Sequence, residues 1–170
     1  MTDLLIRPEQ SHDRDAVRLV NERAFGGHEE ADLVEALHRA QAAVVALVAE
    51  VDAGIVGHIL FSPVEVEHSM GKRLLGLAPM SVEPGHQKQG IGGRLVREGL
   101  ALCRTAGADG VVVLGHAEYY PRFGFATAQR FGLRCEYDVP ADVFMAIELH
   151  DGSLVGVSGL VRYHAAFAGV

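Results

Sequence analysis

Four glycines lie within nine residues and mark the segment of the chain best suited to bind a ligand: Gly85, Gly90, Gly92 and Gly93. The pattern of apolar residues predicts that this segment joins a strand to a helix. The first N–H groups of a helix lack intrahelical partners, and the helix dipole adds partial positive charge there. Glycine lets these groups approach an anion because it has no Cβ atom. The segment therefore predicts a phosphate-binding turn.

Two familiar nucleotide loops do not match this turn. A P-loop would place Lys-Ser or Lys-Thr after a glycine at the start of the helix, where this chain has Gly92-Gly93-Arg94. A dinucleotide-binding fingerprint would need a third glycine at position 95, which is a leucine. The residues instead spell Gln87-Lys88-Gln89-Gly90-Ile91-Gly92, a Q-x-x-G-x-G pattern. Lys88 is equally consistent with an ion pair to phosphate and with a solvated side chain.

The apolar segment before the turn, residues 74–82, contains Pro79. Proline cannot donate to a sheet ladder, so within a strand it indicates an edge or a bulge. A bulge would open N–H and C=O groups that must find other partners. A peptide-like ligand could supply them.

A second group of residues with chemical potential follows four consecutive aliphatic residues, 111–114. It contains His116 and the block Tyr-Tyr-Pro-Arg-Phe-Gly-Phe over residues 119–125. The hydroxyl of Tyr120 could donate a proton. Alternatively, its ring could simply pack beside the neighbouring phenylalanines.

The elements that must position these residues are predicted from hydrophobic periodicity and turn signals. One helix is predicted to begin at an N-cap, Ser11 or Asp13, and to include Ala24. Two further helices are predicted over residues 29–40 and 91–106. Strands are predicted over residues 4–7, 44–51, 55–67, 74–82, 111–114, 133–137 and 144–149. The strand, helix and buried strand that surround the turn form a crossover, so strands 74–82 and 111–114 should be parallel. The fold class is α/β with a mixed central sheet, in one domain over residues 1–170.

The two blocks resemble the GNAT superfamily of N-acetyltransferases. The turn resembles the superfamily's coenzyme A loop, Q/R-x-x-G-x-G/A, and residues 119–125 resemble its aromatic-Tyr-x-x-x-Gly-Phe element. Residues 139–145 and 157–163 look like the bacterial YhbS-like branch. The resemblance implies a mostly antiparallel sheet with flanking helices, whose parallel fourth and fifth strands splay to admit the pantetheine arm. It implies that acetyl-CoA is bound through Met80, Ser81, Val82, Gln87, Lys88, Gln89, Gly90, Ile91, Gly92 and Gly93.

The implied reaction is direct transfer of acetyl from coenzyme A to a primary amine in a ternary complex. By resemblance, Tyr120 is the acid that protonates the leaving thiolate. Some relatives carry a glutamate base on the fourth strand, but residues 74–82 contain no carboxylate. His116 is the preferred base because imidazole exchanges protons near neutral pH, and the alternatives are Glu118, His58 and Glu65. Two other functions stay open: a non-catalytic module that senses acyl-CoA, and an acetyltransferase acting on charged tRNA.

The composition of the chain limits the classes of partner that it is expected to bind. The chain has 15 basic and 22 acidic residues, a formal net charge of −7, which disfavours nucleic acid and anionic membranes. The two cysteines are too few for a disulfide framework, and the longest apolar stretch, residues 42–49, is far shorter than a membrane span. The nine histidines show no ligand-like spacing, so no metal is predicted. We expect a cytoplasmic protein with a small-molecule or peptide amine as acceptor. Whether the protein forms a homodimer stays open.

Overall fold

The computed structural model describes residues 3–169, and the chain divides into two units that share several elements. Within the described range, unit 1 contains the residues up to Phe61, those from Ala78 to Gly99, and those from Ala166 onward. Unit 2 consists of Ser62–Leu77 and Leu100–Ala165. One domain over residues 1–170 stays a prediction.

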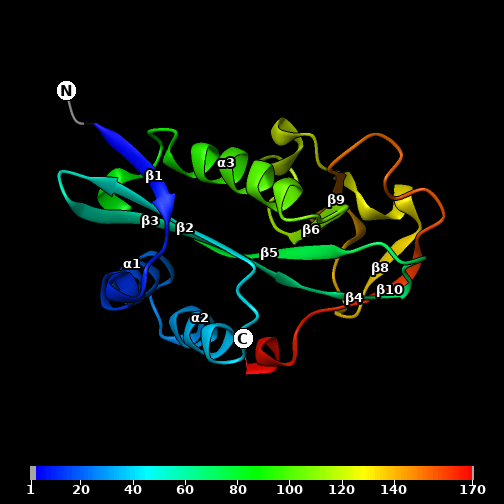
Figure 1. Ribbon diagram of the computed structural model, residues 1–170, viewed down its shortest axis with the longest axis horizontal. Helices are drawn as coiled ribbons and strands as arrows, with labels where there is room; N and C mark the ends of the chain where they lie inside the picture. Colours follow the sequence, from blue (N-terminus) through cyan, green and yellow to red (C-terminus); the bar gives the residue numbers. More distant parts are fainter. Residues whose placement is uncertain (1–2, 170) are drawn as a thin grey trace. The chain divides into compact units, whose positions relative to one another are not determined.

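Unit 1 is built on an antiparallel sheet (Figure 1). Its strands are neighbours in the order β1, β2, β3 and β5. They span Leu4–Pro8 (β1), Val45–Val51 (β2), Gly54–Pro63 (β3) and Leu74–Val82 (β5), with the last residues of β3 and the first of β5 in unit 2. The α-helices are Arg14–Phe25 (α1), Glu29–Arg39 (α2) and Ile91–Thr105 (α3), the last of which continues into unit 2.

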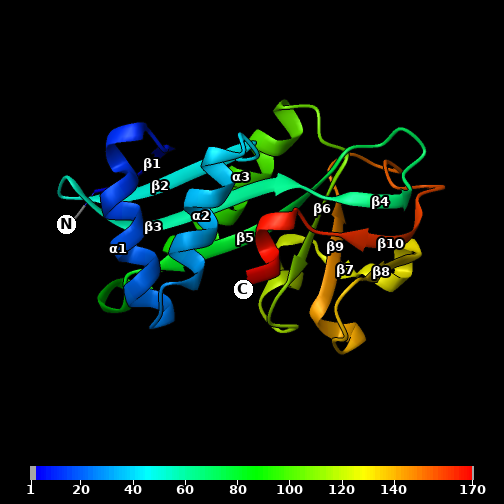
Figure 2. The ribbon, with the colours of Figure 1, turned by 90° about the horizontal axis from the view of Figure 1, so that it is seen from below.

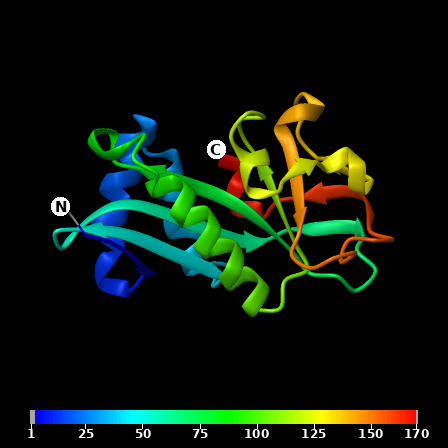
Figure 3. The ribbon, with the colours of Figure 1, turned by 90° about the horizontal axis from the view of Figure 1, so that it is seen from above.

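Helices cover both faces of this sheet. α1 and α2 lie on one face (Figure 2), and the part of α3 in unit 1 lies on the other (Figure 3). Strand β3 between them is buried without interruption from Val56 to Ser62. Gly57 admits α3 closely, since a Cβ there would lie 3.1 Å from Leu95 and 3.3 Å from Ile91. Alternate β3 residues therefore face different helices.

Gly99 sets how closely α3 packs on β3. A Cβ added at Gly99 would lie 2.5 Å from Cε2 and 2.7 Å from Cζ of the fully buried Phe61 ring. Overpacking of this kind outweighs the helix propensity that alanine gains. We expect Gly99→Ala to lower the free energy of unfolding in urea by about 1–2 kcal/mol. Gly85→Ala is the matched control, because its Cβ would meet no atom within 4 Å; equal stability of the two variants would contradict the packing role.

Unit 2 contains the start of β5 and six further strands. These are Glu65–His68 (β4), Gly110–Leu114 (β6), Ala126–Thr127 (β7), Leu133–Cys135 (β8), Phe144–Glu148 (β9) and Ser158–Arg162 (β10). Four of these strands are neighbours in one sheet, in the order β5, β6, β9, β7. The pair β5 and β6 is parallel, and the other two pairs are antiparallel. A separate sheet has the order β4, β10, β8. Short 3-10 helices occupy Ser11–Asp13, Pro84–His86, Tyr120–Phe123, Ala128–Phe131, Ala141–Val143 and Ala165–Gly169.

The predicted fold class is confirmed: the chain is α/β, mostly antiparallel, with a parallel pair β5 and β6 and flanking helices. The single strand predicted over 55–67 is wrong. Pro63 has no N–H to donate, and the chain there changes partner, so that β3 pairs with β2 whereas β4 pairs with β10. Strands β7 and β10 were not predicted, and α1 begins at Arg14 after a 3-10 turn. None of the helices in residues 3–169 has the length and apolar character needed to cross a membrane.

Candidate functional site

The glycine-rich turn of unit 1 joins the end of β5 to the start of α3. After the 3-10 turn Pro84–His86, the chain takes a left-handed conformation at Lys88 (φ 63°) and Gly90 (φ 84°). A Cβ at Gly85 or Gly90 would meet no atom within 4 Å. The backbone of the turn is therefore open to a ligand.

The start of α3 favours an anion. Its first turn contains no acidic residue, so no carboxylate neutralises the positive end of the helix dipole. The Arg94 N–H donates to Gly90 O over 3.1 Å, which closes the first turn. The side chains of Lys88 and Gln89 are exposed beside it. These features are those of a phosphate site at a helix N-terminus.

Gln87 has a structural partner within the turn. Its Nε2 donates to Val82 O over 3.1 Å, and the Glu83 N–H donates to Val56 O over 2.7 Å. These two bonds fix the end of β5 and the entrance of the turn. The sequence pattern did not reveal this internal role of Gln87.

The second half of β5 carries the residues predicted to bind pantetheine. Among the described residues, the parallel register of β5 with β6 runs from Leu74 to Gly76 and stops there, although β5 continues to Val82. Met80 and Val82 are half-buried, and Ser81 is buried. The short ladder is consistent with the predicted splay of these two strands.

A buried charged cluster lies in unit 1 around Glu9, whose side chain is 1% exposed. Its Oε1 lies 2.7 Å from Nε2 of His58, a fully buried residue. Its Oε2 lies 3.1 Å from Nε2 of His38 and 3.2 Å from Nε of Arg14. Burial by itself raises the pKa of the Glu9 carboxyl. Its interactions with His38 and His58 lower this pKa by a larger amount, so that the pKa falls from 4.5 to about 2. Glu9 is thus a permanent carboxylate at neutral pH, and nothing in the spacing of the sequence pointed to it.

Tyr120 is held in unit 2 by aromatic packing. Its ring lies 5.1 Å from that of Tyr119 and 5.6 Å from that of Phe125, in edge-to-face geometry. Gly115 makes room for it, because a Cβ there would overlap the Tyr120 ring. Burial raises the pKa of Tyr120 to about 12. The hydroxyl therefore stays protonated and able to donate well above neutral pH.

The other predicted bases in unit 2 are exposed. His116 follows β6, and its carbonyl accepts the N–H of Tyr119 over 3.0 Å and that of Tyr120 over 3.4 Å. His116 therefore anchors the turn that carries Tyr120. Glu118 is exposed between them.

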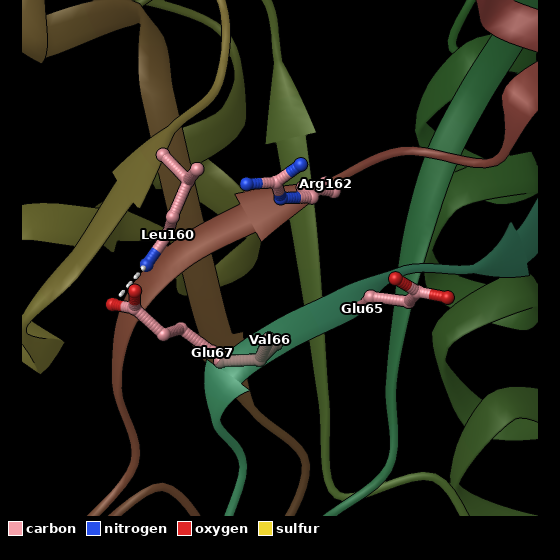
Figure 4. A pocket seen from close by; sticks show the side chains of 5 residues that line it. All are labelled: Glu65, Val66, Glu67, Leu160 and Arg162. Carbon is pink, nitrogen blue, oxygen red and sulfur yellow. Dashed lines mark hydrogen bonds between the residues drawn. The ribbon is translucent and has the colours of Figure 1, made fainter.

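Glu65 is distant in the sequence from the turn that carries Tyr120. It lines a small pocket of about 140 Å³ in unit 2. Figure 4 shows this pocket over β4 and β10, where the Leu160 N–H donates to Glu67 Oε1. The remaining lining residues are Val66 and Arg162. None of the predicted cofactor residues contributes to it.

The predicted site residues belong to two units. The cofactor residues from Met80 to Gly93 lie in unit 1, and His116 and Tyr120 lie in unit 2. Their membership of one active site stays a prediction.

Comparison with known proteins gives consistent results. Residues 42–127 match the acetyltransferase (GNAT) domain. The chain is 37% identical over 167 residues to the uncharacterised N-acetyltransferase YhbS of Escherichia coli strain K12, covering 96% of this chain and 98% of that one. The structure is similar to that of the Escherichia coli GNAT family N-acetyltransferase YhbS in complex with CoA (TM-score 0.92, 36% identity, 98% of this chain and 93% of that chain). It is also similar to a GNAT family acetyltransferase from Brucella melitensis in complex with acetyl-CoA (TM-score 0.80, 39% identity, 97% and 98%).

Proposed function

The chain belongs to the GNAT acetyltransferase family, and from this premise we propose that it transfers an acetyl group from acetyl-CoA to a primary amine. The observation that carries the proposal is the open turn between β5 and α3, with Gly90 in a left-handed conformation and no acidic residue in the first turn of the helix. Two relatives similar over nearly the whole chain are bound to CoA and acetyl-CoA. The cofactor is therefore acetyl-CoA, used as a co-substrate.

We assign the pyrophosphate to the backbone of residues 87–93, with Lys88 as a nearby cation. We assign the pantetheine arm to the backbone at Met80 and Val82. The same segment would hold the tetrahedral oxyanion through its N–H groups. Support comes from the parallel ladder of β5 that ends at Gly76.

The reaction replaces the C–S bond of the thioester with a C–N bond and includes two proton transfers. The amine nitrogen attacks the thioester carbonyl, forming the C–N bond, and the C–S bond then breaks. The leaving thiolate takes a proton from the Tyr120 hydroxyl, which burial keeps protonated. The proton lost by the amine passes to a base, and His116 is our assignment among the exposed groups.

The acceptor is an amine of a small molecule or a peptide. The net charge of −7 favours a cationic acceptor, since opposite charge steers encounter. We propose that the reaction takes place in the cytoplasm.

Isothermal titration with acetyl-CoA tests the proposal. We expect saturable binding by the wild-type protein and about tenfold weaker binding by Gly90→Ala, because alanine is strained at φ 84°. Gly71→Ala is the matched control: Gly71 has φ 77° and equally open surroundings but lies in the turn between β4 and β5. The control should bind like the wild type. Absence of acetyl-CoA binding up to millimolar concentration would disprove the proposed function.

The acyl-CoA-sensing alternative predicts a different result. A sensor would bind acetyl-CoA but release no free thiol with any member of a panel of primary amines. We expect thiol release, because the relative that covers nearly the whole chain is named as an N-acetyltransferase.

A further inference from the structure

The ring of Tyr163 lies on Gly76 of β5, and both residues belong to unit 2. A Cβ added at Gly76 would stand 2.8 Å from Cε1 and 3.3 Å from Cδ1 of Tyr163, and 3.0 Å from Cγ1 of Val64. Any larger residue at this position would have to displace one of these neighbours. The space that a side chain of residue 76 would fill is therefore occupied by the tyrosine ring.

Gly76 is also the residue at which the pairing of β5 with β6 ends. Its partner in the parallel register is Val112, and no later pair follows among the described residues. Both strands nevertheless continue, β5 to Val82 and β6 to Leu114. Paired strands are only about 4.8 Å apart and admit no ligand between them. A ligand that enters between β5 and β6 must therefore stop at the pair Gly76 and Val112.

Neighbouring residues of unit 2 hold Tyr163 in this place. Its ring stacks on that of Tyr137, with the centroids 6.0 Å apart and the planes inclined by 27°. Its N–H donates to Glu136 Oε1 over 2.7 Å, and the Glu136 N–H donates to Val161 O over 3.2 Å. Tyr163 is 9% exposed, whereas Tyr137 is 40% exposed. Both the ring and the backbone of Tyr163 are therefore fixed.

Tyr163 also lies near Tyr120, the residue that we assign as the acid. Burial raises the pKa of Tyr163, and neighbouring acidic groups, Tyr120 among them, raise it further. The two tyrosines are thus close enough for the charge of one to act on the other. The ring of Tyr120 likewise occupies the side-chain space of a glycine, Gly115, which directly follows β6. Each of the two strands therefore has a glycine that makes room for one of these tyrosines.

We propose that Tyr163 sets the size of the acyl group that is transferred, by closing the inner end of the space between β5 and β6. The proposal rests on the proposed function, in which the pantetheine arm enters along β5 and Tyr120 protonates the sulfur. The acyl group is attached to that sulfur at the tip of the arm, so it is the part of acetyl-CoA that comes nearest to Gly76 and Val112. The ring on Gly76 leaves room for an acetyl group and blocks a longer chain.

Acyl-CoA substrates of increasing chain length test the proposal. The value of kcat/KM is compared for acetyl-, propionyl- and butyryl-CoA, with the best primary amine of the panel. The wild type should prefer acetyl-CoA. Tyr163→Ala should raise the ratio of butyryl-CoA to acetyl-CoA activity about tenfold or more, because loss of the ring leaves an apolar cavity beside Gly76. Affinity for butyryl-CoA, measured by titration, should rise in the same variant, and this second readout does not depend on turnover.

Two further variants separate the ring from other effects. Tyr163→Phe removes only the hydroxyl and keeps the ring on Gly76, so its ratio should stay within about threefold of the wild type. Tyr137→Ala is the matched control, because it removes the same ring from the more exposed member of the stack. It should also keep the ratio of the wild type. An equal shift in Tyr137→Ala and Tyr163→Ala would indicate a general loosening of unit 2 and would overturn the proposal.

An unchanged ratio and unchanged butyryl-CoA affinity in Tyr163→Ala would also overturn the proposal, and would leave the proposed function standing. If Tyr163→Ala does not fold, Tyr163→Leu decides by the same two measurements, since leucine is shorter than tyrosine and keeps an apolar side chain. Failure of the wild type to bind acetyl-CoA would disprove both the proposed function and the role of Tyr163.

Discussion

Tyr120→Phe is expected to lower kcat about 100-fold while acetyl-CoA affinity stays the same. The substitution removes only the hydroxyl. The ring contacts with Tyr119 and Phe125 and the space left by Gly115 are preserved, so the fold should not change. Without the acid, the thiolate must leave unprotonated or take its proton from water. Single-turnover thiol release together with isothermal titration of acetyl-CoA separates the two effects.

Tyr119→Phe is the matched control for Tyr120→Phe. It removes the same atom from the adjacent residue and retains the ring over which Arg122 lies at 4.6 Å. We expect its kcat within about threefold of the wild type. Because the pKa of Tyr120 is raised to about 12, the step that depends on it should persist into the alkaline range. Equal kcat in Tyr120→Phe and the wild type would reduce Tyr120 to a packing residue.

Glu9→Gln is expected to destabilise the protein by about 3 kcal/mol at neutral pH. The carboxylate is buried, its Oε1 is hydrogen-bonded to His58 Nε2 at 2.7 Å, and its Oε2 lies within ion-pair distance of His38 (3.1 Å) and Arg14 (3.2 Å). An amide of the same size carries no charge to pair with Arg14, and its own N–H groups meet donors. Urea unfolding at pH 7 measures the loss. Glu65→Gln makes the same change at an exposed position and should shift stability by less than about 0.5 kcal/mol.

The same carboxylate should govern stability in acid. The pKa of Glu9 falls from 4.5 to about 2 on folding, and the hydrogen bond from Arg7 lowers that of Asp13 from 3.8 to about 2. Lowered pKa values contribute stability that is complete above about pH 5 and is lost as the pH falls toward 2. The wild type should therefore lose stability steadily over this window. Glu9→Gln should show a shallower loss, and a slope equal to that of the wild type would contradict the assignment.

Features that depend on neighbours in the sequence were predictable. The turn before α3 follows from glycines at fixed spacing at a strand-to-helix junction. Likewise, the parallel pairing of β5 and β6 follows from a strand–helix–strand crossover. In both cases the physical cause is the conformation of a few consecutive residues, which residue type and period express directly.

Pairings between distant segments were not predictable in the same way. The run 55–67 reads as one strand, yet it divides at Pro63 because β4 pairs with β10, nearly a hundred residues later in the chain. The sequence of strand β10, Ser158–Arg162, does not alternate between apolar and polar residues. Its formation depends on pairing with β4 and β8. A short strand without a clear pattern is determined by its partners.

The sequence by itself indicated the family, through the resemblance of two motifs, and it indicated the fold class and the glycine-rich turn before α3, because local spacing and periodicity encode these two features. Only the tertiary structure decided that Glu9 contacts His58, 49 residues away, and His38. A lone glutamate and two histidines carry no spacing signal. Their chemistry arises from burial and from long-range contacts, and both exist only once the sheet and its helices have assembled.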